Sequence, residues 1–333
     1  MRVLTSSLIK ANFLYMDRKL KIGVVCITLN VPYWQYAPEM LWGLDTFFLK
    51  HPSIKDKYET EFMLWSDIPE TPAEIQQRLA ESLAQTGKAK TSLVSEESVE
   101  ILVDPVRKVD LVNQVQALVD MKKRVKVFPA EPIEWPMPTL MRYHLFLQQE
   151  EYLQKFDYVF YIDVDMRITD WIGEEILGNG LTAAQHPMYA LRRNYQPPYE
   201  PNPDSSAYIP RPGRLVDQEG KRMFEQLYYA GGFQGGKTAD WIKAMKEMRK
   251  SVDEDFSRNY VAIWNDETHW NKYLFGTPPA VVLSPSYIYP DSLLDKYYVP
   301  LWGRNYSPKI MTLTKSFTTS KEGGDAVSKM LAL

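Results

Sequence analysis

Four short apolar runs, separated by segments of helical periodicity, constrain the fold of this chain most strongly. Runs of this length, rich in β-branched and aromatic residues, are typical of parallel strands buried on both faces of a sheet. They cover residues 21–30, 60–66, 124–128 and 157–163. Helical segments lie between them, at residues 38–49, 72–85, 109–121 and 138–155. This alternation predicts an α/β fold with an open, mostly parallel sheet flanked by helices.

Outside these elements the chain alternates between polar loops and short structured pieces. Residues 86–99 are low in hydrophobic side chains and predict an exposed loop. Residues 187–214 are rich in Pro, Tyr and Arg, which indicates an irregular segment with a function rather than a linker. A strand is predicted near residues 227–233 and a helix over 238–250.

The bulk composition excludes several classes of protein. A net charge of −3 over 333 residues gives no broad electrostatic attraction for nucleic acid. The single cysteine, Cys26, excludes an internal disulfide framework. No apolar run approaches the ~20 residues of a membrane helix, and the N-terminus is a poor signal peptide. We therefore expect a soluble, cytoplasmic protein without a transmembrane segment.

Asp163 and Asp165 follow the clearest strand of the sequence, Tyr158 to Ile162. Carboxylates two residues apart at a strand end can share one divalent cation, and ligands of open α/β sheets bind beyond the carboxyl ends of the strands. A strand-end turn or a helix cap is the alternative. A second match to the same pattern, Asp253-Glu254-Asp255, lies in a charged stretch and is expected to be solvated surface.

Two further segments could form the floor of a polar pocket. In Trp264–His269, the adjacent acids Asp266 and Glu267 stand beside an aromatic residue; a carboxylate there could act as a nucleophile or stabilise an oxocarbenium-like transition state. A helix start capped by Asn265 or Asp266 is the alternative and is compatible with that role. The glycine-bearing run Tyr228–Gly236 allows close approach of a ligand, or forms a tight turn or bulged strand.

Two lysines near the C-terminus, Lys309 and Lys315, suit a diphosphate leaving group, with solvated surface lysines as the alternative. The four His residues show no metal-ligand spacing, and no serine-hydrolase elbow is present.

Several short motifs in a fixed order carry a family resemblance. They begin with Trp135 and Arg142, continue through the strand-end aspartates and His186, and end at Leu283-Ser284-Pro285. The other matching segments are Ser206–Pro210, Tyr228–Gly236 and Trp264–Tyr273. Together they resemble glycosyltransferase family 6, the retaining family of the histo-blood-group A and B transferases and the α1,3-galactosyltransferase. The resemblance covers residues 130–290 well and the first 50 loosely.

The resemblance implies a GT-A-type fold and α1,3 transfer, with retention, of Gal or GalNAc from a UDP-sugar to an oligosaccharide or glycolipid. Asp163 and Asp165 would hold Mn²⁺, or Mg²⁺, against the diphosphate, and Glu267 would be the nucleophile or ion-pair stabiliser. His186 and Trp264 would contact the acceptor. Donor or UDP binding would fall to Thr28, Asn30, Tyr33, Arg142, Asp163, Asp266, Lys309 and Lys315.

The triplet Ala230-Gly231-Gly232 matches the family position that sorts donors. Small side chains there leave room for a 2-acetamido group, which favours UDP-GalNAc without excluding UDP-Gal. The resemblance also implies a single catalytic domain over residues 1–333. Its nucleotide-binding half would cover about 20–165, its acceptor-binding half about 166–300, and its basic tail 301–333.

The chain departs from the family pattern in several places. Asn265 stands where the family usually has His, Leu191-Arg192-Arg193 replaces two adjacent tryptophans, and residues 66–130 are longer than in the animal enzymes. Both aspartates are kept, which predicts metal dependence, and the missing membrane anchor suggests a microbial or phage member. The rival hypotheses are a nucleotide-sugar hydrolase or inverting transferase on the same fold, and a catalytically silent glycan-binding protein.

Overall fold

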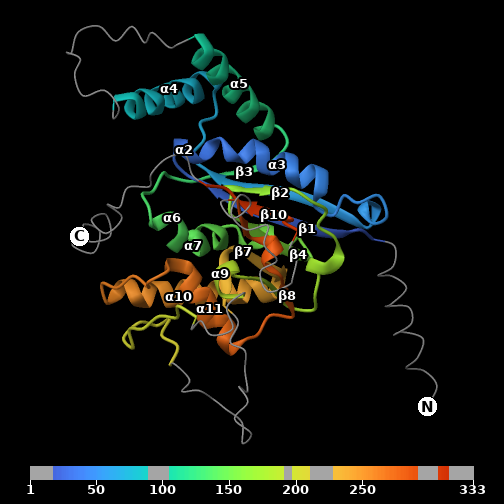
Figure 1. The fold of residues 1–333 in the computed structure, drawn as a ribbon, viewed down its shortest axis with the longest axis vertical. Helices are drawn as coiled ribbons and strands as arrows, with labels where there is room; N and C mark the ends of the chain where they lie inside the picture. Colours follow the sequence, from blue (N-terminus) through green and yellow to red (C-terminus); the bar gives the residue numbers. More distant parts are fainter. Residues whose placement is uncertain (1–17, 89–104, 191–196, 211–227, 292–306, 315–333) are drawn as a thin grey trace, which may run out of the picture.

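The computed structural model describes residues 18–88, 105–190, 197–210, 228–291 and 307–314. Within them a seven-stranded sheet has the order β3-β2-β1-β4-β7-β6-β8 and carries helices on both faces (Figure 1). All its neighbouring strands are parallel except β7, which is antiparallel to β4 and β6. The predicted α/β fold with a mostly parallel mixed sheet is confirmed. The strands are β1 (Leu20–Thr28), β2 (Tyr58–Ser66), β3 (Lys126–Pro129), β4 (Tyr158–Ile162), β6 (Leu181–Gln185), β7 (Tyr229–Lys237) and β8 (Val281–Leu283).

Two layers of helices cover the sheet, and one pair projects beyond them. Helices α2 and α3 lie over one face with α4 and α5 stacked outside them, while α6, α7, α10 and α11 lie on the other face (Figure 1). The longer helices are α3 (Tyr36–Phe47), α4 (Pro72–Lys88), α5 (Pro105–Lys122), α10 (Thr238–Ser257) and α11 (Asn265–Gly276). The shorter ones are α2 (Val31–Trp34), η1 (Lys55–Lys57), α6 (Met137–Leu140), α7 (Arg142–Leu147), α8 (Glu150–Leu153), η2 (Glu174–Ile176), α9 (Pro187–Ala190) and η3 (Pro285–Tyr287).

The strands are apolar on both faces because each face packs against its own core. In β4, Phe160 and Ile162 pack into the cluster beneath α3, whereas Val159 and Tyr161 pack into the cluster beneath α7 and α10. Successive side chains of a strand point to opposite faces, so a continuous apolar run is needed to fill both clusters. Asp163, two residues after Tyr161, continues on the α7 side.

A second, three-stranded sheet carries the C-terminal part of the described chain back to the end of β4. Strand β10 (Ile310–Thr312) is antiparallel to β5 (Met166–Ile168) and parallel to β9 (Tyr289–Pro290). The amide of Leu313 donates to the carbonyl of Asp165 at 3.1 Å. Residues 313 and 314 therefore lie beside the Asp163–Asp165 turn, while Lys315 lies outside the described residues.

The single helix predicted over residues 138–155 is wrong. Three short helices, α6, α7 and α8, replace it, and the backbone leaves the α-helical region at Met141 (φ −89°, ψ 0°) and at Gln149 (φ −114°, ψ 28°). Each piece turns its own apolar side chain, Leu140, Phe146 or Leu153, into the interior. Tertiary packing thus overrides the local preference for one continuous helix.

The expectation that Asp253-Glu254-Asp255 is solvated surface is wrong for its second aspartate. The segment lies inside α10, and Asp255 is 1% exposed. Its carboxylate accepts hydrogen bonds from the Ser205 hydroxyl and the Ser206 amide, both at 2.6 Å. Asp255 therefore anchors the irregular segment 197–210 against α10. Asp253 does face solvent, where it pairs with His144 and Arg249.

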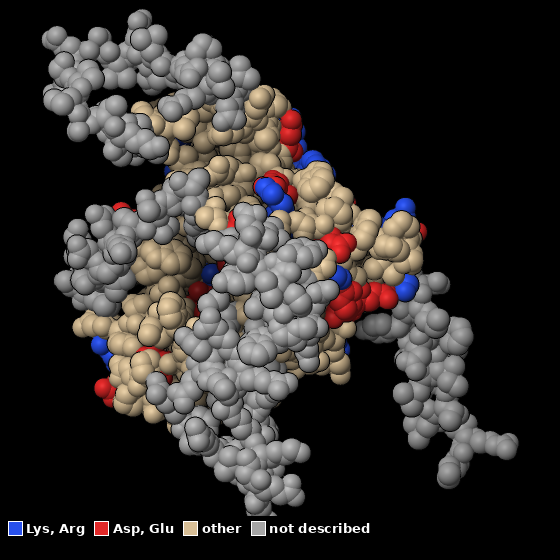
Figure 2. Space-filling model, in the orientation of Figure 1, with Lys and Arg blue, Asp and Glu red and all other residues tan. Residues whose placement is uncertain are grey.

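The described parts of the two predicted halves share one sheet, because β7 from the second half pairs with β4 from the first. No helix among the described residues is long and apolar enough to cross a membrane. On the visible described surface, acidic side chains lie beside basic ones rather than in a broad field of one sign (Figure 2). This mixed distribution agrees with the small net charge of −3.

Candidate active site

Segments from distant parts of the chain converge at the carboxyl edge of the parallel strands, where ligands bind in open α/β sheets. The loops after β1, β2 and β4 start at this edge. Strand β7 runs the opposite way, so its first residues reach the same edge, where the Asp163 amide donates to the Gly232 carbonyl at 3.0 Å. The first turn of α11 packs on that strand, and the Gly231 amide donates to Glu267 Oε2 at 2.7 Å.

Arg142, the first residue of α7, joins the two pairs of acids. Its guanidinium lies 3.0 Å from Asp266 and 3.5 Å from Asp163, donates to the Gly231 carbonyl at 3.1 Å, and sits 4.2 Å above the Tyr161 ring. The side chain is only 4% exposed. Burial works to lower the pKa of Arg142, but Asp266 and the neighbouring groups outweigh it, so the pKa is raised and the charge is permanent.

Glu267 and Asp266 are carboxyl groups held in a poorly solvated place. Burial raises the pKa of Glu267 to about 7, although its hydrogen bond from the Gly231 amide opposes that rise. Burial also raises the pKa of Asp266, and here the Arg142 guanidinium opposes it. A carboxylate in such a poorly solvated place interacts strongly with any positive charge that develops next to it.

A helix does begin at these acids, but neither Asn265 nor Asp266 caps it, so the capping alternative is corrected. The N-cap position is Trp264, whose backbone amide donates to the Thr268 hydroxyl at 3.0 Å. Asn265 has φ 51°, and the Asp266 side chain turns inward to Arg142. The two acids occupy the first turn, where the helix dipole stabilises negative charge.

Asp163 and Asp165 supply the hard oxygen ligands that Mn²⁺ and Mg²⁺ prefer. Asp163 is 32% exposed and accepts the Tyr161 hydroxyl, and Asp165 is buried. Burial, then the charges of Asp163 and Asp165, raise the pKa of the Cys26 thiol, so both carboxylates act on the same end of β1. No three acidic, His or Cys side chains gather as a ligand set in the described part of the chain. A cation held by these two aspartates would have to take its remaining ligands from phosphate or water.

The predicted nucleotide residues surround the end of β1. Thr28 is fully buried, and its hydroxyl has no hydrogen-bond partner among the described residues. Asn30 has φ 74° and donates through its side-chain amide to the Ile133 carbonyl at 2.9 Å. Tyr33 packs against Tyr36, with ring centroids 6.5 Å apart. These side chains share the sheet edge with Asp163.

The predicted acceptor residues lie around the start of β7 and α11. The His186 amide donates to the Tyr228 carbonyl, and the His186 ring packs on Tyr189 and Tyr228. Burial lowers the pKa of His186 to about 4, so the imidazole is neutral at pH 7. Trp264 is 48% exposed and stands directly before the two acids, where an apolar sugar face can pack on it.

The structure does not bring Lys309 to the Asp163–Asp165 turn. The strand register places Lys309 opposite Thr169, four residues from Asp165, or about 13 Å along an extended strand. Its ammonium lies 2.6 Å from Glu175, which also accepts the Tyr287 hydroxyl at 2.5 Å. The pattern of two lysines in the sequence could not reveal that ion pair.

Gln234 and Asn271 were given no role from the sequence, yet both organise the site. Gln234 is fully buried and donates to the Gly231 carbonyl at 3.0 Å, while its carbonyl accepts the Tyr143 hydroxyl. Asn271 accepts from the Tyr229 amide and donates to the Tyr229 carbonyl, which joins α11 to β7. Both lie inside the matched motifs, but a buried amide's partners cannot be read from a motif.

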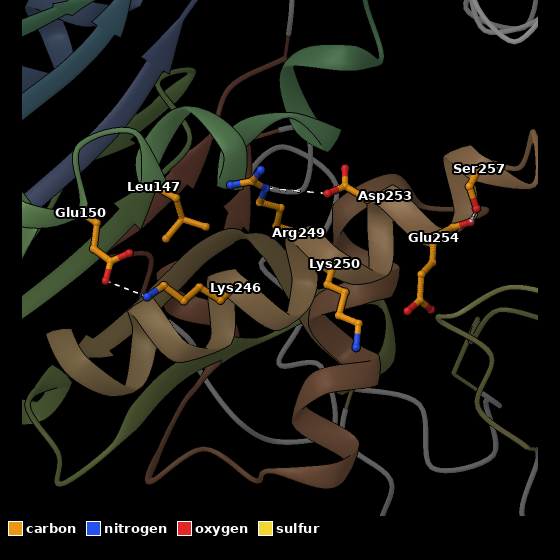
Figure 3. Close-up of a pocket in the computed structure, with 8 residues that line it drawn as sticks. All are labelled: Leu147, Glu150, Lys246, Arg249, Lys250, Asp253, Glu254 and Ser257. Atoms are coloured by element: carbon orange, nitrogen blue, oxygen red, sulfur yellow. Dashed lines mark hydrogen bonds and ion pairs between the residues drawn. The ribbon is translucent and has the colours of Figure 1, made fainter.

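A separate cavity of about 550 Å³ lies between the α7–α8 region and α10 (Figure 3). Two ion pairs line it, one between Lys246 and Glu150 and one between Arg249 and Asp253. It contains none of the predicted site residues, so the candidate site is defined by the sheet edge. The lining residues are Leu147, Glu150, Lys246, Arg249, Lys250, Asp253, Glu254 and Ser257.

The sequence matches one protein family and several known proteins. The family model described as "Glycosyltransferase family 6" matches residues 112–298, more than half of the chain. The histo-blood group ABO system transferase 1 of Rattus norvegicus is 37% identical over 146 residues, 44% of this chain and 38% of the relative. The globoside alpha-1,3-N-acetylgalactosaminyltransferase 1 of Homo sapiens is 33% identical over 135 residues, 40% of this chain and 35% of the relative.

A bacterial relative matches over a longer stretch. The O-antigen biosynthesis glycosyltransferase WbnI of Escherichia coli is 28% identical over 192 residues, 57% of this chain and 73% of the relative. The matches to the animal relatives, by contrast, span only about two fifths of those proteins' length. The family match covers the segments that carry Arg142, the Asp163–Asp165 turn and the Asp266–Glu267 pair. The chain belongs to glycosyltransferase family 6, whose members have the GT-A type of fold.

Proposed function

We propose that this chain is a retaining glycosyltransferase that moves GalNAc or Gal from a UDP-sugar to a glycan hydroxyl in α1,3 linkage. The observation that carries the proposal is the bridge made by Arg142 between Asp163 and Asp266. It puts a candidate cation site, the buried Asp266 and the partly buried Glu267 around one charged side chain. The relatives named above are glycosyltransferases, and one is an alpha-1,3-N-acetylgalactosaminyltransferase.

In this proposal each side of the site has its own substrate. Asp163 and Asp165 would hold Mn²⁺, or Mg²⁺, which when bound would neutralise the diphosphate of the leaving UDP. The uridine would lie along Thr28, Asn30 and Tyr33. The acceptor, an oligosaccharide or glycolipid, would pack against Trp264 and His186. Lys309 is left without a direct contact to the diphosphate, because Glu175 holds it away from the turn.

The chemistry assigned to the acids follows from their burial. As the bond between the anomeric carbon and the diphosphate breaks, positive charge develops on the sugar, and the Glu267 carboxylate stabilises it from the opposite face. Asp266, fixed by Arg142, would accept hydrogen bonds from donor-sugar hydroxyls. The acceptor hydroxyl then forms the new bond on the face that UDP leaves and passes its proton to the departing diphosphate, so the anomeric configuration is retained.

Gly231 and Gly232 are where donor selectivity would be set. A Cβ on Gly231 would stand 3.1 Å from Glu267 Cβ and 3.2 Å from Asp266 Oδ2. Both acids thus pack closely against the Gly231 backbone, and a side chain at this position would crowd them. The small residues at this family position favour UDP-GalNAc as the donor without excluding UDP-Gal.

We expect UDP to raise the melting temperature of the wild type, and to raise it further with Mn²⁺, because a ligand that binds only the folded state stabilises it. A glycan-binding protein without transferase activity would respond to oligosaccharide and not to UDP.

The transfer reaction itself is measured with UDP-GalNAc and UDP-Gal on a panel of glycans. NMR of the product's anomeric proton distinguishes retention from inversion, and release of free sugar without acceptor would indicate a hydrolase.

The substitution Gly232→Ala is expected to weaken Mn²⁺-dependent UDP binding at least about tenfold. The new methyl group would lie 2.3 Å from Met166 Cε and 2.6 Å from Asp163 Oδ2, so the carboxylate must move. Calorimetric titration with UDP and Mn²⁺ measures the effect. The matched control is Gly276→Ala, because nothing beyond the adjoining backbone of its own helix lies within 4 Å of the added carbon. Equal UDP affinity in both variants would contradict the placement of the cation at Asp163.

A further inference from the structure

Asp67, directly after β2, is a buried carboxylate at the candidate-site edge that the proposed reaction does not use. Its side chain is only 2% exposed. One oxygen, Oδ1, accepts both the Asn30 amide at 3.0 Å and the Trp34 indole N–H at 2.8 Å. These donors bracket the segment 30–34, which follows β1 and includes Tyr33. A single carboxylate therefore holds both ends of that segment.

The segment needs such support because of its backbone. Asn30 has φ 74°, a left-handed conformation that costs free energy for any residue except glycine. The residue is held from two sides: its amide donates to Asp67, and its side chain donates to the Ile133 carbonyl in the loop after β3. The conformation at Asn30 thus depends on contacts made by the loops after β2 and β3.

Arg78 supplies the positive charge that a buried carboxylate requires. It donates to Asp67 Oδ2 at 2.8 Å and to the Asp67 carbonyl at 2.9 Å, and its guanidinium lies 4.7 Å from the centre of the Trp34 ring. Arg78 belongs to α4, the first helix of the α4–α5 pair that stands outside α2 and α3 (Figure 1). Through Asp67, helix α4 is thereby tied to the end of β1.

We infer that Asp67 is a positioning residue of the donor site and that Arg78 is its support from α4. Asp67 sets the conformation of residues 30–34 and so the place where the nucleoside end of the donor binds. Both of its oxygens are engaged by protein donors, so it acts through Asn30 and Trp34 rather than on the ligand. This inference rests on the proposed function, which places the uridine at Thr28, Asn30 and Tyr33.

The test uses Asp67→Asn and Arg78→Met in the full chain, titrated with UDP in the presence of Mn²⁺. Asparagine turns an amide nitrogen toward Arg78, and methionine keeps an unbranched side chain without the charge. Each change removes a charge-assisted hydrogen bond, so Kd for UDP and KM for the UDP-sugar are expected to rise about tenfold. Acceptor KM and kcat at saturating donor should stay within about twofold.

The control Arg124→Met breaks an ion pair with Asp45 that is exposed on both sides, and it should leave Kd for UDP unchanged. If the wild type fails to bind UDP, the proposed function fails. If the wild type binds UDP and the two variants bind it equally well, the positioning role of Asp67 and Arg78 is contradicted, while the proposed function stands. Equal loss of donor and acceptor binding would also contradict the positioning role. Should Asp67→Asn not fold, Arg78→Met, whose side chain is 34% exposed, decides the question.

Discussion

Replacing Glu267 by glutamine is expected to lower kcat about 10²–10³-fold, the usual loss when one electrostatic partner of a transition state is removed. Glutamine keeps the shape and can still accept the Gly231 amide, whose bond to Glu267 Oε2 is 2.7 Å long. The negative charge that faces the anomeric carbon is lost, whereas the contacts to UDP are untouched. Kd for UDP should therefore stay within about twofold.

The measurement pairs steady-state kinetics with calorimetric titration of UDP. The matched control is Glu247→Gln, the same change on the exposed side of α10, which should leave both quantities unchanged. An unaltered kcat in Glu267→Gln would remove Glu267 from the mechanism. A parallel loss of UDP binding would instead indicate a disturbed β7–α11 contact.

Glu267→Gln should also be more stable, relative to the metal-free wild type, at pH 8 than at pH 5. Burial raises the pKa of Glu267 from 4.5 to about 7, so between these values the folded state binds more protons than the unfolded state. The stability due to this group is complete below about pH 4.5 and is lost as the pH rises through about 7. Glutamine does not titrate. The melting temperature of Glu267→Gln relative to the wild type should thus rise from pH 5 to pH 8, and an unchanged difference would contradict the raised pKa.

The sequence predicted the strands that frame the site because their pattern is unambiguous. Strands buried on both faces need continuous apolar runs, and β1, β2, β3 and β4 were predicted within two residues at either end. Strands β6 and β8 escaped prediction. LTAAQ in β6 is rich in alanine, and β8 has only three residues, so neither carries a distinct strand signal. Their place in the sheet comes from pairing with distant strands.

The parts of the site that depend on contacts between residues far apart in the sequence could not be predicted either. The aspartates after β4 were expected at the sheet edge because strand direction alone puts them there. That Arg142 would join Asp163 to Asp266 could not follow from periodicity, because three separate elements meet at that side chain. For Lys309, the spacing of the two lysines suggested a phosphate contact. In the structure its ammonium pairs instead with Glu175, which is 134 residues away in the chain.

Asp165→Asn is expected to lower transfer about 10³-fold or more, because a bound divalent cation contributes several kcal/mol to stabilising a departing diphosphate. Asparagine keeps the size of the side chain, and the Asp165 carbonyl that accepts the Leu313 amide is unchanged, so the turn and β10 should stay in place. The substitution removes one of the two negative charges that are proposed to hold the divalent cation. The Mn²⁺-dependent part of UDP binding should disappear, while the weaker binding measured in EDTA remains as in the wild type.

The chain offers a matched control for that substitution in Asp253→Asn. Asp253 opens the second D-x-D sequence, on the exposed side of α10, where it pairs with His144 and Arg249. The chemical change is the same and both residues belong to a D-x-D sequence, but Asp253 is exposed on a helix, away from the sheet edge. Asp253→Asn should therefore keep full activity and full Mn²⁺ dependence. Wild-type turnover that persists in EDTA would contradict a metal role for Asp165, whatever the variants show.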